Sequence, residues 1–357
     1  VLVSKGRFNG MAGFYYLNAT ALTQFDVRLF TTVSGLTAYT DAKIVTDTMA
    51  GFVNLTYDLT DHIGLEAGGR YTWDKREATI LRQNYLGGGS PTFGGAGIAF
   101  GAPSTNFMGG ATYTKFTPRA SINWKPDSNN TIYVSYSQGF KGGGFDPRGV
   151  GVNAPAGMTQ GEFLSFRPEK VNNYEVGVKT RLFDRKLGLN LAAFRMDYTD
   201  VQIPGSVACT VSGLPSFCGV VSNAGKARMQ GVEAEGHFKL GVLTLNGSLG
   251  YIDAKYLKYI TLSNGAPPDV AAYRKVQNTP AWNGNASATV ALPVPKGSLD
   301  LTGGMSWKST TYQFEVPNPY LDQPAYALFD ASLVYRAPGG RWTLGVYGKN
   351  LADKRYK

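Results

Sequence analysis

The sequence predicts an all-β fold, a transmembrane antiparallel up-and-down β-barrel, and three observations carry this prediction. Polar and apolar residues alternate with a period of two, and many of the alternating segments reach the roughly 9–11 residues that a bilayer-spanning strand needs. Short polar turns alternate with longer irregular connections along the chain. Aromatic residues recur near the strand ends on the apolar side, as they do at a lipid–water interface.

The clearest alternation lies in residues 114–124. Phe116, Ile122 and Trp124 share one side of this strand, whereas Lys115 and Arg119 lie on the other. About thirteen strands are predicted in this way, over residues 7–17, 47–57, 63–82, 112–125, 130–142, 170–182, 187–203, 225–239, 242–258, 279–293, 298–312, 325–336 and 341–353. The aromatic residues near their ends are Trp124, Tyr136, Tyr251, Trp282, Trp307, Tyr335 and Trp342. A soluble β-sandwich also alternates, but it needs no aromatic girdle and its strands average about 5–6 residues.

One predicted strand breaks the pattern. In residues 187–202, Leu187, Leu189 and Leu191 share one side, whereas Met196 and Tyr198 lie on the other. A β-bulge near residues 192–193 would restore the phase, so we expect one there. Gly225 and Gly231 flank a second place where the backbone is expected to bulge or coil sharply.

The connections between strands fall into two classes. Six are short and rich in Gly, Pro, Asn and Asp: residues 58–61, 126–129, 184–186, 239–241, 293–297 and 337–340. In an outer-membrane barrel the short turns are periplasmic and the long loops extracellular, so the first and last predicted strands both run outward. Thirteen is odd, whereas single-chain bacterial barrels close with an even number of strands, so we expect a returning strand beyond residue 357.

Composition excludes several other classes of protein. No apolar run approaches the roughly 18–20 residues of a membrane-spanning helix. The N-terminal VLVSKGRFNG has no signal-peptide features, so a mature chain or a fragment is expected. The net charge is +10, but the basic residues are scattered rather than clustered, which argues against a nucleic-acid partner.

Several segments resemble the TonB-dependent receptors of the Gram-negative outer membrane. The most similar are PEKVNNYEVGVKTRLFDRKLGLNLAAFRMDYTDVQ at 168–202 and NAGKARMQGVEAEG at 223–236. YVSYSQGFKGGGFDPRG at 133–149 and GVYGKNLADKRY at 345–356 also match, in the same order along the chain. Two earlier stretches, MAGFYYLNAT at 11–20 and NLTYDLTDHIGLEAGGRYTWDKRE at 54–77, look like mid-barrel strands of the same family. The motifs are short, but together they span nearly the whole sequence.

This resemblance implies a barrel of 22 strands around an N-terminal plug domain. Residues 1–357 would then be a partial barrel domain covering the ninth to the twenty-first strand, without the plug, its TonB box and the final strand. It also implies an outer-membrane receptor that imports a scarce nutrient, a ferric siderophore above other cargo, energised through TonB. The implied partners are TonB, a small metal chelate, outer-membrane lipid and lipopolysaccharide, and no cofactor is implied.

Two groups of residues are candidates for contact with the cargo or the plug. Basic side chains are expected on the lumenal side, either paired with plug acids and water or forming an electropositive funnel for anionic ligands: Arg70, Lys115, Arg119, Lys179 and Arg181. Aromatic and basic residues of the external loops could form a ligand platform or simply pack the loops: Phe140, Lys141, Phe145, Arg148, Tyr312, Phe314 and Tyr320.

The remaining motifs carry little chemistry. Cys209 and Cys218 lie in a predicted external loop, where an oxidising compartment favours a disulfide over two free thiols. His62 and His237 stand alone beside short turns, which predicts neither a metal site nor a catalytic triad, and we expect no enzyme. The glycine-rich stretch 87–110 precedes no helix pattern and is expected to be a mobile external loop rather than a phosphate-binding turn.

Several alternatives remain open from sequence. The weakest is an outer-membrane hydrolase, and a stronger one is a passive porin or a surface adhesion barrel. Cobalamin or an oligosaccharide is an alternative cargo. An upstream plug-encoding sequence of about 130–200 residues would exclude the porin.

Overall fold

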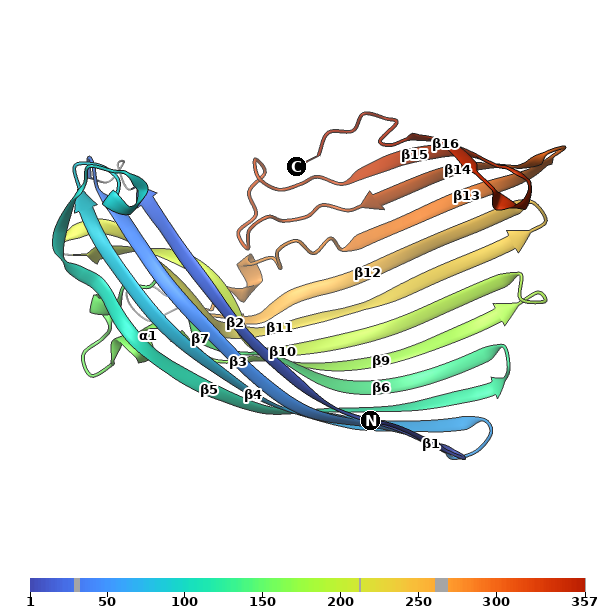
Figure 1. Ribbon diagram of the computed structural model, residues 1–357, viewed down its shortest axis with the longest axis horizontal. Helices are drawn as coiled ribbons and strands as arrows, with labels where there is room; N and C mark the ends of the chain where they lie inside the picture. The colour runs from blue at the N-terminus through green and yellow to red at the C-terminus, as the bar shows by residue number, and fades with distance from the viewer. Residues whose placement is uncertain (29–32, 212, 261–268, 357) are drawn as a thin grey trace.

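The computed structural model describes residues 1–28, 33–211, 213–260 and 269–356. Fourteen strands form one continuous antiparallel sheet in which each strand pairs with its neighbour along the chain, β6 pairing with β9 across an intervening loop. The sheet curves into a wide arc, with the short turns at one end and long extended hairpins at the other (Figure 1). Among the described residues, no helix is long and apolar enough to cross a membrane.

The strands of this large sheet are β1 (Leu2–Lys5), β2 (Phe8–Arg28), β3 (Thr37–Asp58), β4 (Ile63–Leu86), β5 (Ile98–Asp127), β6 (Asn130–Lys141), β9 (Glu169–Leu182), β10 (Leu187–Val211), β11 (Leu214–Leu240), β12 (Leu243–Tyr259), β13 (Trp282–Val294), β14 (Gly297–Lys308), β15 (Tyr326–Arg336) and β16 (Thr343–Gly348). A separate two-stranded sheet pairs β7 (Gly144–Phe145) with β8 (Ser165–Phe166). The helical turns are η1 (Pro91–Phe93), η2 (Gly151–Asn153), α1 (Gln160–Leu164), η3 (Ala271–Tyr273) and η4 (Pro338–Gly340).

The all-β fold is confirmed, and each predicted strand corresponds to one strand of the large sheet. The large sheet has fourteen strands where about thirteen were predicted, because the short strand β1 also pairs with β2, through a tight turn at Gly6 with φ +60°. Four residues are too few to show a period of two, so the sequence pattern missed this strand. The count in the described residues is even, so strand parity gives no argument for a further strand.

Three outward hairpins, β2–β3, β4–β5 and β10–β11, extend well beyond the predicted strand ends. β5 begins at Ile98 and pairs with β4, so much of the glycine-rich stretch expected to be a mobile loop is strand. Glycine has no side chain to show alternation, and that hides a strand from a periodicity test.

The β-bulge expected near residues 192–193 is absent. β10 keeps an unbroken register with both β9 and β11 from Leu187 to Thr199, and the irregular positions lie at Thr199–Gln202, opposite Gly225. Met196 and Tyr198 therefore share the face of Asn190, and the Tyr198 hydroxyl donates to the Met196 sulfur at 3.6 Å. The change of phase in the sequence is real, and it places apolar side chains on the lumenal face.

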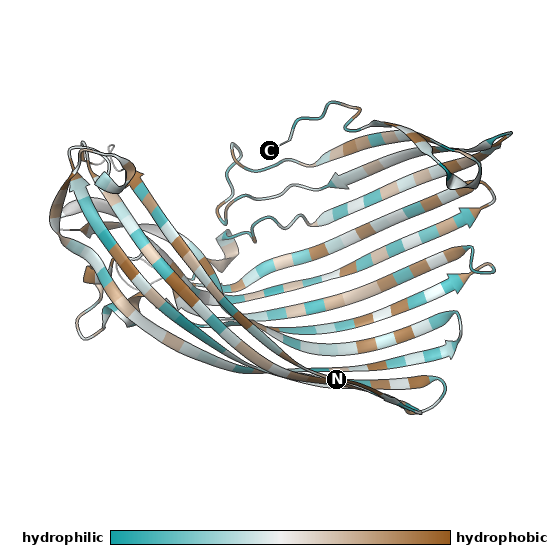
Figure 2. Cartoon of the chain, viewed as in Figure 1, coloured by the Kyte–Doolittle hydropathy of each residue, from teal (hydrophilic) through white to brown (hydrophobic). Residues whose placement is uncertain are grey.

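The register gives the sheet two faces of different character. Arg70, Thr117 and Arg119 belong to the polar face, and Leu65, Ile122 and their cross-strand neighbours belong to the apolar face. The apolar face is open: Phe14 is 70% exposed and Ile122 56% exposed. Brown and teal residues alternate along the strands (Figure 2). An exposed apolar surface of this extent fits lipid rather than water, so the polar face lines the lumen.

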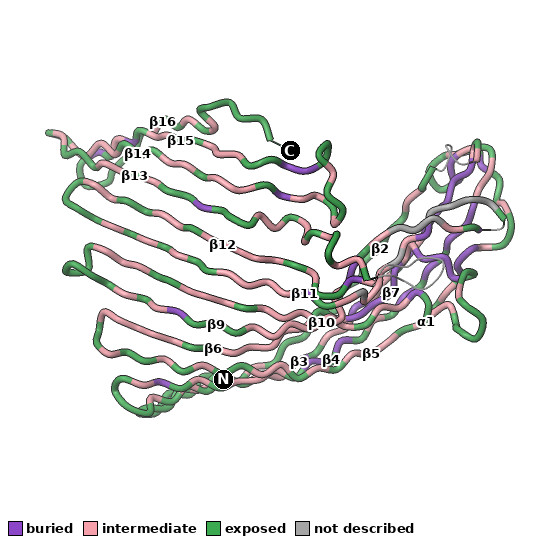
Figure 3. Tube along the Cα trace, turned by 180° about the vertical axis from the view of Figure 1, so that it is seen from behind, coloured by how far each residue is buried: buried purple, intermediate pink, exposed green. Residues whose placement is uncertain are grey.

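The outward face changes from apolar to polar at a consistent level, which we name the outer boundary. Along single strands the change falls between Trp73 and Lys75, between Met49 and Asp47, and between Tyr251 and Asp253. Ring pairs lie at or just below this level, including Tyr71 with Trp73 (4.4 Å) and Tyr251 with Trp282 (4.6 Å). Beyond it, several apolar residues of β3 and β4 point inward, and the buried residues gather at that end (Figure 3).

The outer boundary gives a direct labelling test. In a Cys209→Ser/Cys218→Ser background, Lys75→Cys is expected to react in intact cells with a membrane-impermeant maleimide, whereas Tyr71→Cys is expected to stay unreacted because lipid covers it. Labelling is measured as a mass shift of the full-length protein. Equal labelling at both positions would place the boundary elsewhere.

Candidate ligand-binding site at the extracellular end

The segment between β6 and β9 folds inward onto the lumenal face of the extended hairpins. Phe145 and Leu164, 7% and 3% exposed, pack against Ala42, Ala78 and Ile80 of β3 and β4. The short helix α1 within this segment begins with a capping box. The Thr159 hydroxyl accepts from the Glu162 backbone amide, and the Glu162 carboxylate accepts from the Thr159 backbone amide. A small hydrophobic core therefore fixes the segment to the wall.

A buried charge cluster fastens the same segment. Asp146, 3% exposed, accepts two hydrogen bonds from the Arg148 guanidinium, at 3.0 and 2.9 Å. Arg82 of β4 is equally buried and donates to the Arg148 carbonyl. Burial lowers the pKa of Arg82, and the hydrogen bond with Asp146 raises the pKa of Arg148. The buried Asp146 carboxylate pairs with Arg148 and attracts Arg82, which offsets part of the cost of burying Arg82.

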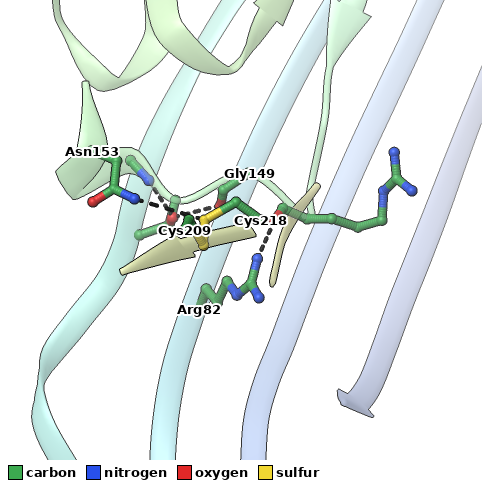
Figure 4. Close-up of a disulfide and its surroundings, with 8 residues drawn as sticks. Arg82, Gly149, Asn153, Cys209 and Cys218 are labelled. Atoms are coloured by element: carbon green, nitrogen blue, oxygen red, sulfur yellow. Dashed lines mark hydrogen bonds between the residues drawn. A yellow bond between two sulfur atoms is a disulfide. The ribbon is translucent and has the colours of Figure 1, made fainter. Parts of the chain in front are cut away.

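The end of the β10–β11 hairpin lies against this cluster, where the Gly219 amide donates to the Arg148 carbonyl at 3.1 Å, and a disulfide between Cys209 and Cys218 crosslinks the hairpin (Figure 4). Cys218 packs with Val150 and Val211, and its sulfur accepts from the Asn153 side-chain amide at 3.7 Å. On the other side, the Thr105 hydroxyl of β5 donates to the Gly149 carbonyl at 2.9 Å. The expected disulfide is present, but it crosslinks paired strands rather than a free loop.

Loss of this disulfide is expected to loosen the hairpin end. A Cys209→Ser/Cys218→Ser variant removes a crosslink worth about 2–3 kcal/mol for a loop of this size. Hydrogen exchange of the peptide containing residues 203–211 is expected to accelerate, with a peptide of the β4–β5 hairpin below the outer boundary as the internal reference. Unchanged exchange would show that packing alone holds the hairpin.

A second loop, between β14 and β15, is held by hydrogen bonds within the loop and by a contact with the segment before β13. The Asp322 carboxylate accepts from the backbone amides of Gln313 and Asn318, at 3.2 and 2.7 Å. The Lys275 ammonium lies 5.8 Å from the centre of the Tyr312 ring, which joins this loop to the segment before β13. These contacts leave Phe314 53% and Tyr320 87% exposed at the rim.

The structure separates the residues predicted as a ligand platform. Phe140 pairs with Lys170 on the outward face, and Phe145 is buried in the inward core, so neither side chain is offered to a ligand in the lumen. Lys141 lies opposite Glu169 on the lumenal side, and Arg148 belongs to the charge cluster. Tyr312, Phe314 and Tyr320 belong to the second loop, between β14 and β15.

The predicted lumenal basic residues do lie on the lumenal face, and the wall itself partners several of them. Arg119 pairs with Glu66 at 2.8 Å, and the Arg70 guanidinium lies 4.9 Å from the centre of the Tyr15 ring. The Lys179 ammonium lies 5.7 Å from the Tyr133 ring. Lys115 stands opposite Thr72.

Near the short turns, Lys179 and Arg181 line a polar cavity of about 690 Å³ together with Asn190, Glu235 and His237. The His237 ring nitrogen Nδ1 lies 2.6 Å from the Asn246 side-chain oxygen, and His62 Nδ1 lies 2.8 Å from the Lys125 carbonyl oxygen. Within the described ranges, no group of three His, Cys, Asp or Glu residues is arranged to hold a metal ion.

Comparison with known proteins decides the family. The model of the TonB-dependent receptor-like β-barrel matches residues 3–351. The chain belongs to the TonB-dependent receptor family. The family consists of transport receptors. The homologues of this chain in that family are Gram-negative outer-membrane proteins.

Individual relatives of this TonB-dependent receptor are more distant. It is 27% identical to the pesticin receptor of Yersinia pestis over 330 residues, which is 90% of this chain and 41% of that protein. It is 28% identical to the metal-pseudopaline receptor CntO of Pseudomonas aeruginosa over 249 residues, 67% of this chain and 30% of that protein. The chain thus spans less than half the length of these curated relatives.

Solved structures agree on the fold. The ferric yersiniabactin uptake receptor FyuA from Yersinia pestis superimposes with a TM-score of 0.71 at 21% identity, over 99% of this chain and 48% of that one. The copper transporter OprC superimposes with a TM-score of 0.63 at 14% identity, over 98% of this chain and 53% of that one.

Sequence reasoning missed the inward core and the charge cluster at the extracellular end. A signal for the core was present: Ala42, Ile44, Ala78 and Ile80 are apolar at positions that share the lumenal face of Thr48 and Thr72. Such an inversion of the alternation along one strand indicates where the apolar side stops facing lipid.

Proposed function

We propose that this chain forms part of the wall of an outer-membrane receptor that imports a ferric siderophore, with energy supplied through TonB. The observation that carries the proposal is the family match across residues 3–351. The names of the relatives support iron or metal chelates as cargo: ferric yersiniabactin, ferric pyoverdine, ferrichrome and metal-pseudopaline. The lumenal basic residues Arg70, Lys115, Arg119, Lys179 and Arg181 suit an anionic chelate or the acids of a plug.

Transport in this proposal requires parts of the protein outside residues 1–357. TonB engages such receptors through the plug domain, so the coupling step is not performed by the wall. The wall's role is to hold the plug, to line the route and to present the rim residues Tyr312, Phe314 and Tyr320 to the arriving chelate. Outer-membrane lipid and lipopolysaccharide surround it.

The test is uptake of radiolabelled iron as its siderophore complex, in wild-type cells and in a strain lacking the gene. Deletion is expected to abolish uptake of one ferric siderophore, and a protonophore is expected to abolish it equally in the wild type. Iron starvation is expected to induce the gene. Intact uptake of all siderophores together with no induction would overturn the iron assignment. Uptake that resists the protonophore would instead support a passive porin.

A further inference from the structure

The wall contains an interruption between β5 and β6, just below the outer boundary. The two strands pair as far as Arg119 and Ser137, and their pairing stops there. Both strands continue beyond this point, β5 paired with β4 and β6 paired with β9. Residues 115–118 and 138–141 therefore face each other without strand pairing, and we name this stretch the β5–β6 seam.

A proline explains why the pairing stops. The Lys125 amide donates to the His62 carbonyl, so the odd-numbered residues of β5 direct their backbone groups toward β4 and the even-numbered residues face β6. Pro118 is one of the residues that face β6, and it has no N–H to donate to the Gln138 carbonyl. The next residue that faces β6, Phe116, is then also left outside the ladder.

The seam lies at the depth where the lipid headgroups meet the hydrocarbon. Phe116 is the cross-strand partner of Tyr71, which belongs to the ring pairs at the outer boundary. Pro118 lies one outward position deeper, about 7 Å along the strand. Unpaired backbone groups are costly in hydrocarbon, and the continuous ladder of a barrel wall is what satisfies them. An interruption at this depth therefore needs a polar partner.

The aromatic side chains on the two sides of the seam lean away from it. The Phe116 ring lies over Gly69 of β4, where an added Cβ would come within 2.5 Å of the ring. On the other side, the Tyr136 ring packs on Tyr174 of β9 with the ring centres 5.3 Å apart. Its hydroxyl donates to the Asn172 side chain at 3.0 Å. Neither of these rings covers the seam.

A cavity of about 530 Å³ lies on the lumenal side of the seam. Its lining includes Pro118 and Gln138 of the seam, together with the lumenal residues Arg70 and Arg119. Arg70 forms no ion pair among the described residues, and the Arg119 side chain is 57% exposed beside its partner Glu66. Guanidinium groups placed in this way suit an anionic head group.

An apolar hollow of about 710 Å³ lies on the outward side of the same strands. The small side chains of Ala67 and Ala120 line it, between the larger side chains of Ile122, Val134 and Tyr136. Ala120 and Tyr136 also line the lumenal cavity, so the two spaces adjoin across the wall next to the seam. One space is cationic and the other suits a hydrocarbon chain.

We infer that the β5–β6 seam is a lateral opening that holds an amphiphilic anion, with its charged head in the lumenal cavity and its hydrocarbon tail in the apolar hollow. A ligand with these two parts fits both spaces, and its polar atoms can pair with the backbone groups at the seam. The inference rests on the proposed function for the identity of the cargo, which is a metal chelate that carries an acyl chain. The tail of such a chelate can stay in the outer leaflet while the head reaches the lumen.

The first test restores the missing donor. In Pro118→Val an N–H can bond to the Gln138 carbonyl and extend the ladder, whereas in the control Pro293→Val the changed proline lies in β13 beside a short turn. The probe is hexadecanoate carrying a photoreactive diazirine, added to outer membranes that contain the full-length protein. The wild type and the control are expected to crosslink within residues 116–141. The yield of Pro118→Val is expected to fall by at least about fivefold, the factor that one restored backbone hydrogen bond gives. Equal yields in Pro118→Val and the wild type would overturn the opening.

The second test identifies the occupant by competition with the same probe. The ferric complex of a hydroxamate with a dodecanoyl chain is expected to displace the probe, and the same complex with an acetyl group is expected to leave it bound. Displacement by both complexes would remove the tail from the recognition. No displacement by the dodecanoyl complex would show that the seam holds membrane fatty acid rather than cargo. Equal crosslinking of a neutral diazirine-bearing hexadecanol would show an apolar groove without an anion site.

Failure of this inference can be told apart from failure of the proposed function. Outer-membrane fractionation and the heat-dependent shift in gel mobility report whether each variant is inserted and folded. If deletion of the gene abolishes siderophore uptake but folded Pro118→Val crosslinks like the wild type, the lateral opening alone is refuted. If both crosslinking tests succeed while deletion leaves the uptake of every siderophore intact, the transport assignment fails and the opening with its amphiphile stands.

Discussion

Replacing Gly225 with valine is expected to disrupt the outer part of the β11–β12 pairing. A Cβ atom at this position would lie 1.7 Å from the backbone carbonyl oxygen of Lys258, and backbone cannot move aside as a side-chain tip can. The bulge beside Lys226 exists because glycine lets the two backbones approach this closely. We expect a loss of about 3 kcal/mol or more in the stability of this region.

The measurement is the denaturant midpoint of the folded barrel, together with hydrogen exchange across residues 225–230 and 251–259. The matched control is Gly236→Ala in the same strand, where the added Cβ meets no atom within 4 Å. That variant is expected to retain the wild-type midpoint. A Gly225→Val protein as stable as the control would mean that the bulge can shift at little cost.

Replacing Asp146 with asparagine is expected to release the inward-folded segment between β6 and β9. The carboxylate is 3% exposed and accepts from Arg148, beside the buried Arg82, so its neutralisation leaves buried positive charge without its compensating anion. Removing one partner from a buried ion pair costs about 3 kcal/mol. The open state of the segment should become more populated by roughly a hundredfold.

Limited proteolysis within residues 142–168 measures that population. Asp61→Asn is the control, since Asp61 forms an ion pair with Arg7 at 2.9 Å but its side chain is 85% exposed. Exposed pairs contribute less than about 1 kcal/mol, so this variant is expected to be cleaved like the wild type. Equal cleavage rates in the two variants would show that the hydrophobic core around Phe145 alone keeps the segment in place.

The wall of the barrel could be predicted from sequence because its physical signal is local. Residues 63–71 and 114–124 alternate strictly, and the registers of β4 and β5 place Leu65 with Ile122 and Arg70 with Thr117, as that alternation requires. The six short turns also lie where the glycine, proline, asparagine and aspartate residues predicted them. Each of these features depends on residues that are close along the chain.

The extracellular end could not be predicted, because its contacts join distant segments. Phe145 and Leu164 lie 19 residues apart in an irregular stretch, and their partners Ala42 and Ile80 belong to two different hairpins, β2–β3 and β4–β5. The sequence of β10 shows apolar residues changing sides at Met196. The prediction of a β-bulge there assumes that the lumenal face is polar. Only the registers on both sides of the strand show that it is not.

The pairing order of the wall has a consequence for how the protein assembles. Each strand of the large sheet pairs only with strands next to it in sequence, or across one loop in the case of β6 and β9, so its contacts have short sequence separation. The wall can therefore form hairpin by hairpin. Among the described residues, the segment between β6 and β9 makes contacts of long sequence separation. It joins β3, β4 and β5 to the tip of β10–β11. That segment can reach its final position only after hairpins on both sides of it exist, which makes it a late event in assembly and a point where a correctly paired wall can still be left incomplete.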